Sequence, residues 1–347
     1  MKNIVFSLFI IGILASCHKE NITISTSAHD VFYLENKGAS MPIRVHGKTE
    51  SKVFMMIVHG GPGGNAPVYR TDYVVENVES QFAIVYWDQR NGGYSQGTTN
   101  AEYDSIDDFI EDFEKVVVLL KKRYGSDISI FVNGHSWGGF LTPAFLQKGT
   151  NQTLVKGWIQ SAGAHNIPLL NEYSRQMQLD KADIEIAANR NVAEWTKIKN
   201  YANSLTLPLT KPQSLELNQN ASKAENLTEE RPKPNPQYTK SQIKDNLPLD
   251  FEIMQSLYNP VPKSLINTVF AGRQVSEKMN VINLPTLLLF GKHDYICPAK
   301  LADDIESRIK SVYKKKVILR KSGHGLMAGA DEKEYWDEVK QFINQFK

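Results

Sequence analysis

The sequence predicts an α/β fold in which a mostly parallel central sheet is flanked by helices and interrupted by a helical insertion. Short apolar runs, typical of strands buried on both faces, recur along the chain. Helix-forming segments alternate with these runs, as they do in a parallel sheet built from crossover units. Between about residues 166 and 280 the alternation stops, and polar helical segments with Pro-rich and Asn-rich stretches replace it.

Composition narrows the classes of partner. The chain has 347 residues, of which 41% are hydrophobic and 22% charged, with a formal net charge of +2. This is an ordinary globular composition, long enough for a large core and an insertion. The near-balance of charge gives no support for nucleic acid or an anionic membrane surface as a charge-driven partner. The sequence has no His-Glu-x-x-His, paired Cys-x-x-Cys or phosphate-binding loop, so we expect neither a metal nor a nucleotide cofactor.

The N-terminus is typical of a secreted protein. Lys2 precedes an apolar run, residues 4–15, that is too short to span a membrane, which predicts a signal peptide over residues 1–16. The run ends in Leu-Ala-Ser-Cys, which resembles the lipobox of bacterial lipoproteins. That resemblance implies a lipid on Cys17, a tether over residues 17–28, and a place in the bacterial cell envelope with the lipid as the membrane contact. The alternative is an ordinary signal peptide with a chance cysteine. Cys297 is the other cysteine, so we expect no disulfide within the chain.

Residues 29–165 form the first part of the predicted core. Its expected strands are Val31–Leu34, Met41–His46, Val53–Val58, Phe82–Trp87 and Leu154–Ile159. An amphipathic helix is expected to begin after Ser105 and to end at Gly125, because Ser suits the N-cap and acidic residues fill the first turn.

The motif Gly134-His135-Ser136-Trp137-Gly138 lies between a predicted strand and a predicted helix. A strand, G-x-S-x-G and a helix make a nucleophile elbow, whose tight turn lifts the serine above the sheet edge. The serine hydroxyl then lies at the positive end of the helix. A second G-x-S-x-G surrounds Ser95, but no strand precedes it and no helix follows. Ser136 is therefore the candidate nucleophile, and Ser95 is predicted to be a loop residue.

The predicted strand Val53–Val58 runs into His59-Gly60-Gly61-Pro62-Gly63-Gly64. Glycines at the carboxyl end of a strand let backbone N–H groups approach a ligand closely, so this loop is expected to supply one oxyanion donor, from Gly61 in preference to Gly60. The second expected donor is the N–H of Trp137. The alternative is a flexible turn, which the proline opposes. Asp88 and Arg90 are predicted to form a buried pair that braces the loop.

A serine nucleophile needs a base, and the base needs a group to orient it. Asp294 follows the predicted strand Leu284–Phe290, and His324 lies in a Gly-flanked loop after the predicted strand Lys316–Leu319. The order Ser, acid, His along the chain matches the elbow-containing fold. Of the other histidines, His59 and His135 are predicted to fix loops, and His165, which leads into the insertion, is a candidate substrate contact.

The insertion is predicted over residues 166–280 and the second part of the core over residues 281–347. Within the insertion, helical segments are expected over Leu179–Tyr201, Phe251–Leu257 and Ser264–Phe270, separated by a Pro-rich and Asn-rich stretch over residues 207–237. After the predicted strand that precedes Asp294, helices are expected over Ala299–Lys310 and Asp331–Phe346.

Together, HGGPGG, WDQR, GHSWGG, GKHD-x-x-x-P and GHG resemble the α/β-hydrolase superfamily and, more narrowly, the proline iminopeptidase (prolyl aminopeptidase) family. This resemblance implies the α/β-hydrolase fold with a helical cap, and a serine hydrolase that works through an acyl-enzyme. Cap glutamates hold the free amine of the substrate in that family, and the candidates here are Glu172, Glu185 and Glu194. The chain departs from the family after WDQR, where Asn-Gly-Gly-Tyr-Ser replaces the usual Gly-x-Gly-x-Ser.

The expected function is therefore an aminopeptidase acting on short peptides. A carboxylesterase or lactone hydrolase acting on small esters would use the same three side chains. A catalytically silent lipoprotein that keeps the fold as a binding module is a third alternative, and the presence of all three triad candidates and both oxyanion loops argues against it.

Overall fold

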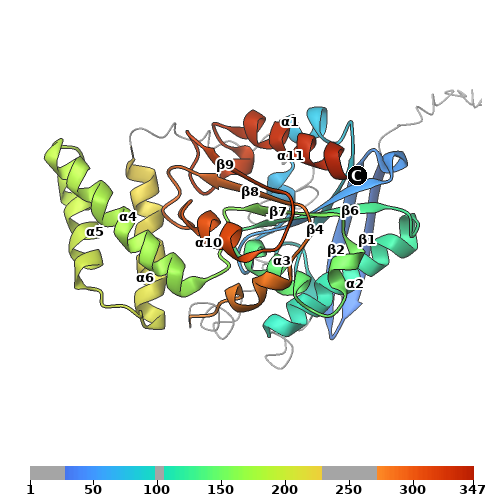
Figure 1. Cartoon of the computed structure of the whole chain (residues 1–347), viewed down its shortest axis with the longest axis horizontal. Helices are drawn as coiled ribbons and strands as arrows, with labels where there is room; N and C mark the ends of the chain where they lie inside the picture. The colour runs from blue at the N-terminus through green and yellow to red at the C-terminus, as the bar shows by residue number, and fades with distance from the viewer. Residues whose placement is uncertain (1–27, 98–104, 229–271) are drawn as a thin grey trace, which may run out of the picture.

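A computed structural model of the chain (Figure 1) describes residues 28–97, 105–228 and 272–347. The predicted signal peptide, Cys17 and nearly all of the tether lie outside the described residues. The predicted helical segments Phe251–Leu257 and Ser264–Phe270 also lie outside them. Within the described ranges, no helix combines the length and the hydrophobicity that a membrane crossing requires.

One sheet organises the described chain. It has nine strands in the order β1-β2-β4-β3-β6-β7-β8-β9, with β5 beside β2. Strands β1, β2 and β5 pair in antiparallel fashion, and the pairs from β4 to β9 are parallel, which confirms the predicted mostly parallel sheet. The strands are β1 Ala28–Asn36, β2 Ala39–Gly47, β3 Val53–Val58, β4 Ala83–Trp87, β5 Gln96–Gly97, β6 Ser129–His135, β7 Gly157–Ser161, β8 Thr286–Gly291 and β9 Lys314–Leu319.

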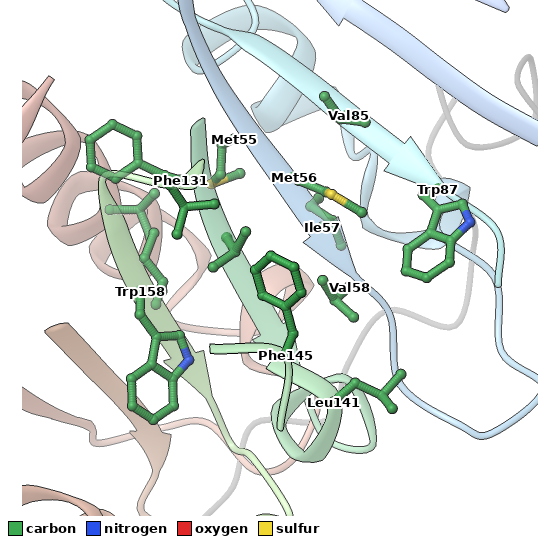
Figure 2. Packing of buried hydrophobic residues seen from close by; sticks show 14 of the residues in the cluster. Met55, Met56, Ile57, Val58, Val85, Trp87, Phe131, Leu141, Phe145 and Trp158 are labelled. Atoms are coloured by element: carbon green, nitrogen blue, oxygen red, sulfur yellow. The ribbon is translucent and has the colours of Figure 1, made fainter. Parts of the chain in front are cut away.

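The uninterrupted apolar runs form the central strands because both faces of the sheet are covered. Every residue of β3 and β4 is buried. Figure 2 shows Met56 and Val58 of β3 near Leu141 and Phe145 of α3 (Gly138–Leu146). The ring of Phe145 stacks on Phe113 at 4.2 Å between centroids, which joins α3 to α2 (Ile106–Tyr124).

Helices α2, α3 and α10 (Leu301–Arg308) cover one face of the sheet, and α1 (Asp72–Asn77) and α11 (Glu332–Phe346) cover the other (Figure 1). Ser105 caps α2 as predicted, in a reciprocal capping box with Asp108. The strand expected from Leu154 begins three residues later, at Gly157, because residues 151–154 form a 3₁₀ turn.

Of the residues described between β7 and β8, three α-helices form the group at the left of Figure 1, namely α4 (Ile167–Ala187), α5 (Val192–Ser204) and α6 (Lys211–Leu227). They share a small hydrophobic core of their own, to which Tyr295 of the sheet domain also contributes. The other buried members of this core are Ala182, Trp195, Ile198, Ala221 and Ala224.

In this region the helical segments expected over Leu179–Tyr201 are present, whereas the following stretch was wrongly expected to lack a helix. The first of the expected segments is the end of α4, which begins earlier, at Ile167, and the second is most of α5. The two helices are separated where Asn189 and Asn191 adopt left-handed φ values of 55° and 45°. Asparagine tolerates this conformation better than most residues do, so it can end one helix and start another. The Pro-rich and Asn-rich stretch contains α6, which begins with a Thr210–Gln213 capping box and has a proline in its first turn, where a missing N–H costs little.

Candidate active site

The nucleophile elbow has the geometry expected from the sequence. Ser136 lies between the end of β6 and the start of α3 with a left-handed φ of 55°. Its glycine neighbours are required by close approach, since an added Cβ would lie 2.2 Å from Thr142 Oγ1 at Gly134 and 1.8 Å from the Val58 carbonyl oxygen at Gly138. The second G-x-S-x-G differs, because Ser95 is a buried loop residue with its hydroxyl 2.8 Å from the Gln89 carbonyl oxygen.

Asp294 and His324 lie in the loops that follow β8 and β9. These strands are parallel neighbours, so their carboxyl ends meet at one edge of the sheet. Asp294 Oδ2 lies 2.9 Å from His324 Nδ1. The carboxyl group is fully buried, and its other oxygen, Oδ1, accepts hydrogen bonds from the backbone N–H groups of Ile296 at 2.9 Å and Cys297 at 2.7 Å. The acid is therefore fixed on both sides.

Ser136 and His324 open on the same cavity, which has a volume of about 240 Å³. Ser136 makes no hydrogen bond to His324 among the described residues. The part of the wall that the described residues form is mostly apolar and carries no carboxylate. It consists of Gly61, Ser136, Trp137, Phe140, Ala164, Ile167, Leu170, Asn218, Ile296, Cys297 and His324. A wider hollow of about 490 Å³, between α4 and residues 292–300, contains neither Ser136 nor His324.

The candidate oxyanion donors differ in whether their backbone N–H group is already hydrogen-bonded. The backbone N–H groups of Gly61 and Trp137 have no acceptor among the described residues, and both residues line the cavity. The N–H of Gly60 instead donates to the hydroxyl of Tyr69 at 3.0 Å. Gly61 is therefore the loop residue left to supply a donor, and Gly60 is not.

The predicted Asp88–Arg90 pair is wrong. Arg90 turns toward α2, where the buried carboxylate of Asp112 needs a cation, and the two pair at 2.6 Å. Asp88 pairs with Arg44 at 3.1 Å and accepts the backbone N–H of Ala66 at 2.7 Å. Asp88 therefore still braces the glycine-rich loop, although with a different cation.

Gln89, which sequence reasoning missed, ties this loop to the elbow. Its backbone N–H donates to His59 Nε2 at 3.0 Å, and its side-chain amide donates to the His59 carbonyl at 2.9 Å. Its side-chain oxygen accepts from the indole N–H of Trp137 at 3.0 Å. The available signal was the position of the HGGPGG and WDQR motifs at the ends of two predicted strands. These strands are β3 and β4, which are adjacent and parallel, so the two motifs meet at one edge of the sheet.

The histidines at the loops are buried and bonded, as predicted. Burial lowers the pKa of His59, whose Nδ1 lies 2.7 Å from the Gly60 carbonyl oxygen. Burial also lowers the pKa of His135, to about 3. His165 does not line the cavity. It is fully buried and lies 2.9 Å from Asp304.

None of the three candidate glutamates lines the cavity. Glu185 is buried between Arg190 and Lys181, and the hydrogen bond from Arg190 is the main reason that its pKa falls to about 2. Glu172 is exposed, and Glu194 is exposed and paired with Lys197 at 2.6 Å.

A different glutamate approaches the site. Glu225 of α6 is almost fully buried, and both of its oxygens lie 3.1 Å from the backbone N–H of His324, which donates to them. Asn218, two turns earlier on the same helix, lines the cavity. Glu225 was missed because its segment was not expected to be helical; the Thr-x-x-Gln capping box at residues 210–213 was the signal that could have revealed it. In the described ranges, no cluster of three or more His, Cys, Asp or Glu side chains is arranged to hold a metal ion.

Comparison with known proteins identifies the family of the chain. The family model described as serine aminopeptidase, S33, matches residues 49–331. The probable aminopeptidase YbaC of Bacillus subtilis (strain 168) is 31% identical over 107 residues, which are 30% of this chain and 33% of that protein. The match to this curated relative thus spans about a third of its length.

Solved structures share the fold. The proline iminopeptidase-related protein from Thermus thermophilus has a TM-score of 0.62 at 19% identity, over 91% of this chain and 99% of its own. The proline iminopeptidase of Mycobacterium smegmatis has a TM-score of 0.63 at 16% identity, over 91% and 98%. An esterase from Exiguobacterium antarcticum has a TM-score of 0.58 at 16% identity, over 90% and 98%. The chain is a hydrolase of the α/β-hydrolase superfamily, and within it the chain belongs to the serine aminopeptidase S33 family.

Proposed function

We propose that the chain is a serine hydrolase in which Ser136 is the nucleophile, His324 the general base and Asp294 the group that orients it. The observation that carries this proposal is the 2.9 Å contact between Asp294 and His324 Nδ1, beside a cavity that also contains the elbow serine. A proton on Nδ1 puts the lone pair of the imidazole on Nε2, which can then take the proton of the serine hydroxyl.

The reaction then follows in two halves. Ser136 attacks the substrate carbonyl carbon, and the N–H groups of Gly61 and Trp137 donate to the resulting oxyanion. His324 passes its proton to the leaving group, and an acyl-enzyme remains. Water activated by His324 attacks the acyl-enzyme, and collapse of the second tetrahedral intermediate restores the serine.

The proposed substrates are short peptides with a free N-terminus and a small apolar first residue, proline included. A cavity of about 240 Å³ with a mostly apolar wall suits a small acyl group. Burial, and then the charges of Asp294 and Glu225, raise the pKa of the Cys297 thiol in that wall. The same negative charge would favour an ammonium group in the cavity. Glu225, which lies behind the cavity wall against the His324 N–H, replaces the three glutamates considered from sequence as the proposed source of that charge.

A cap role is proposed for α4, α5 and α6. Ile167 and Leu170 of α4 and Asn218 of α6 supply part of the cavity wall. Helices in this place would enclose a small substrate and exclude a long chain, as expected of an exopeptidase.

A panel of chromogenic substrates tests the proposal, using purified protein that begins after Cys17. Prolyl and other aminoacyl amides should be cleaved at least 100-fold faster than their N-blocked forms, measured as kcat/KM. Ser136→Ala should lower kcat by at least about 10⁴-fold. Ser95→Ala, at the other G-x-S-x-G, is the matched control and should retain most of the activity. Full turnover by Ser136→Ala would refute the assignment.

The alternative is a carboxylesterase or lactone hydrolase. The absence of a carboxylate among the residues that line the described cavity favours this alternative, because a neutral ester needs no anionic partner. Cleavage of short acyl esters, with no preference for a free amine among the amides, would move the protein to this class.

Lipid anchoring at Cys17 in the bacterial cell envelope is also proposed, on the strength of residues 1–17 alone. The full chain expressed in a bacterium with labelled palmitate should incorporate the label and fractionate with membranes. Cys17→Ser should do neither. Equal membrane association of the two forms would contradict the proposal.

A further inference from the structure

We infer that Tyr69 is a positioning residue that holds the glycine-rich loop, the nucleophile elbow and the His324 loop in one fixed arrangement. The inference rests on the proposed function, because it assigns Tyr69 a role in aligning the proposed catalytic groups. Tyr69 ends a short 3₁₀ turn after the glycine-rich loop. Its hydroxyl lies 3.0 Å from the Gly60 nitrogen and 2.9 Å from His135 Nδ1.

His135 extends the connection to the catalytic histidine. It immediately precedes Ser136, and its Nε2 lies 2.9 Å from the carbonyl oxygen of His324. The rings of His135 and His324 are 4.8 Å apart between centroids. Three segments that are distant in sequence, around residues 60, 135 and 324, are thus joined through two side chains.

The two backbone ends of this chain of hydrogen bonds fix the direction of every bond in it. The carbonyl of His324 can only accept, so His135 Nε2 must carry the hydrogen. His135 Nδ1 is then an acceptor, and the Tyr69 hydroxyl must donate to it. The hydroxyl keeps a lone pair for the N–H of Gly60, which can only donate. No other tautomer satisfies all three contacts.

The bridge stays neutral while the proposed base changes its charge. Burial, and to a smaller extent the charge of His324, lowers the pKa of His135 to about 3. Burial raises the pKa of Tyr69 to about 12. When His324 becomes an imidazolium, His135 therefore remains an uncharged neighbour that holds the His324 backbone without repelling its ring.

The consequence for the reaction is alignment. The hydrogen bond from the Gly60 N–H to Tyr69 fixes the loop at this point. The next backbone N–H, that of Gly61, can then donate to a group in the cavity. Because His135 binds the His324 carbonyl, the base is fixed with respect to the serine that follows His135. Displacements of about 1 Å at such groups cost on the order of 100-fold in rate, mainly in kcat.

Tyr69→Phe tests the inference, since it removes the hydroxyl and leaves the ring. We expect kcat to fall between about 10-fold and 100-fold while KM changes less than about twofold. Tyr86→Phe is the matched control, because it removes another buried hydroxyl, 2.9 Å from Glu79, away from the cavity. Tyr86→Phe should lower the melting temperature without a change in kcat.

Two substitutions at His135 keep the inference testable if Tyr69→Phe folds poorly. Glutamine can place an N–H donor where Nε2 was, whereas asparagine reaches only the Nδ1 position. His135→Gln should therefore retain at least about tenfold more kcat than His135→Asn, because only the glutamine can still hold the His324 carbonyl.

Three results would overturn the inference: Tyr69→Phe with kcat within twofold of the native enzyme, kcat losses in Tyr69→Phe and Tyr86→Phe that simply follow melting temperature, or equal kcat for the two His135 variants. These failures differ from failure of the proposed function, which would appear as turnover by Ser136→Ala.

Discussion

Replacing Asp294 with asparagine should disable the proposed base by forcing the wrong tautomer on it. Oδ1 of Asp294 accepts two backbone N–H groups, at 2.9 and 2.7 Å, and Oδ2 faces His324 Nδ1 at 2.9 Å. Asparagine has one oxygen, and it must take the Oδ1 place, because an NH₂ there would point at two donors. Its NH₂ group then faces His324 Nδ1, which becomes an acceptor. The hydrogen moves to Nε2, so the imidazole can no longer take the serine proton.

The expected loss is about 10⁴-fold in kcat, as for the same substitution in serine proteases. At about 1.4 kcal/mol per tenfold, this corresponds to about 5.5 kcal/mol of transition-state stabilisation. KM should change little, since the carboxyl group of Asp294 is fully buried and does not line the cavity.

The assay is steady-state hydrolysis of the substrate that performs best in the panel, with active enzyme quantified by titration. Asp304→Asn is the matched control, because Asp304 and His165 form another Asp–His pair at 2.9 Å, away from the cavity. It should retain kcat within a few-fold. An Asp294→Asn enzyme with more than a tenth of native kcat would refute the tautomer argument.

Three further predictions concern charge, pH and packing. Glu225→Gln removes the negative charge proposed to favour the substrate amine, so KM for free-amine amides should rise about tenfold while that for N-blocked amides stays within twofold; equal changes in both would contradict the role. The pKa of His135 is about 3 in the folded chain against 6.5 for an ordinary histidine, so between these values the unfolded chain binds more protons. The unfolding free energy should therefore rise with pH across this window, by up to about 1.4 kcal/mol per unit for this residue, and urea unfolding from pH 4 to 7 should show a shallower rise in His135→Gln. An unchanged slope would count against this assignment. Gly138→Ala should cost several kcal/mol of stability or prevent folding, because its Cβ would lie 1.8 Å from the Val58 carbonyl oxygen, whereas Gly325→Ala, whose Cβ meets nothing within 4 Å, should melt close to the native protein. Similar melting temperatures for the two would show that the elbow can relax.

The sequence was sufficient for the sheet and for the loops at its edge. Uninterrupted apolar runs such as Val53–Val58 have one stable place, the middle of a sheet covered on both faces, and this one forms β3 with the predicted bounds. Asp294 and His324 were predicted to act together because each follows a predicted strand in the order Ser, acid, His, and the structure shows these two strands to be parallel neighbours. Local sequence patterns therefore predict the contacts between loops that follow neighbouring strands of the sheet.

Contacts between elements far apart in sequence could not be predicted in this way. Arg90 was assigned to Asp88, two residues away, but its partner is Asp112, on a helix whose rotation the local pattern does not give. Glu185 was a candidate for substrate binding because it lies in the predicted cap, where the resembling family holds the substrate amine with glutamates. In the structure, two cations on its own helix and the following turn pair with it. The pairing of Tyr69 with His135 likewise depends on how a turn folds back over the sheet edge.

The contact between Glu225 and His324 limits how the inserted helices can be exchanged. An engineer who wished to change the acyl preference would replace α4, α5 and α6, which supply Ile167, Leu170 and Asn218 to the cavity wall. Such a graft would also remove the acceptor of the His324 N–H and leave a backbone donor next to the reacting centre without its partner. A successful chimera would have to carry a hydrogen-bond acceptor at the position of Glu225, so the helices that shape the proposed substrate pocket and the loop of the proposed base are not independent modules.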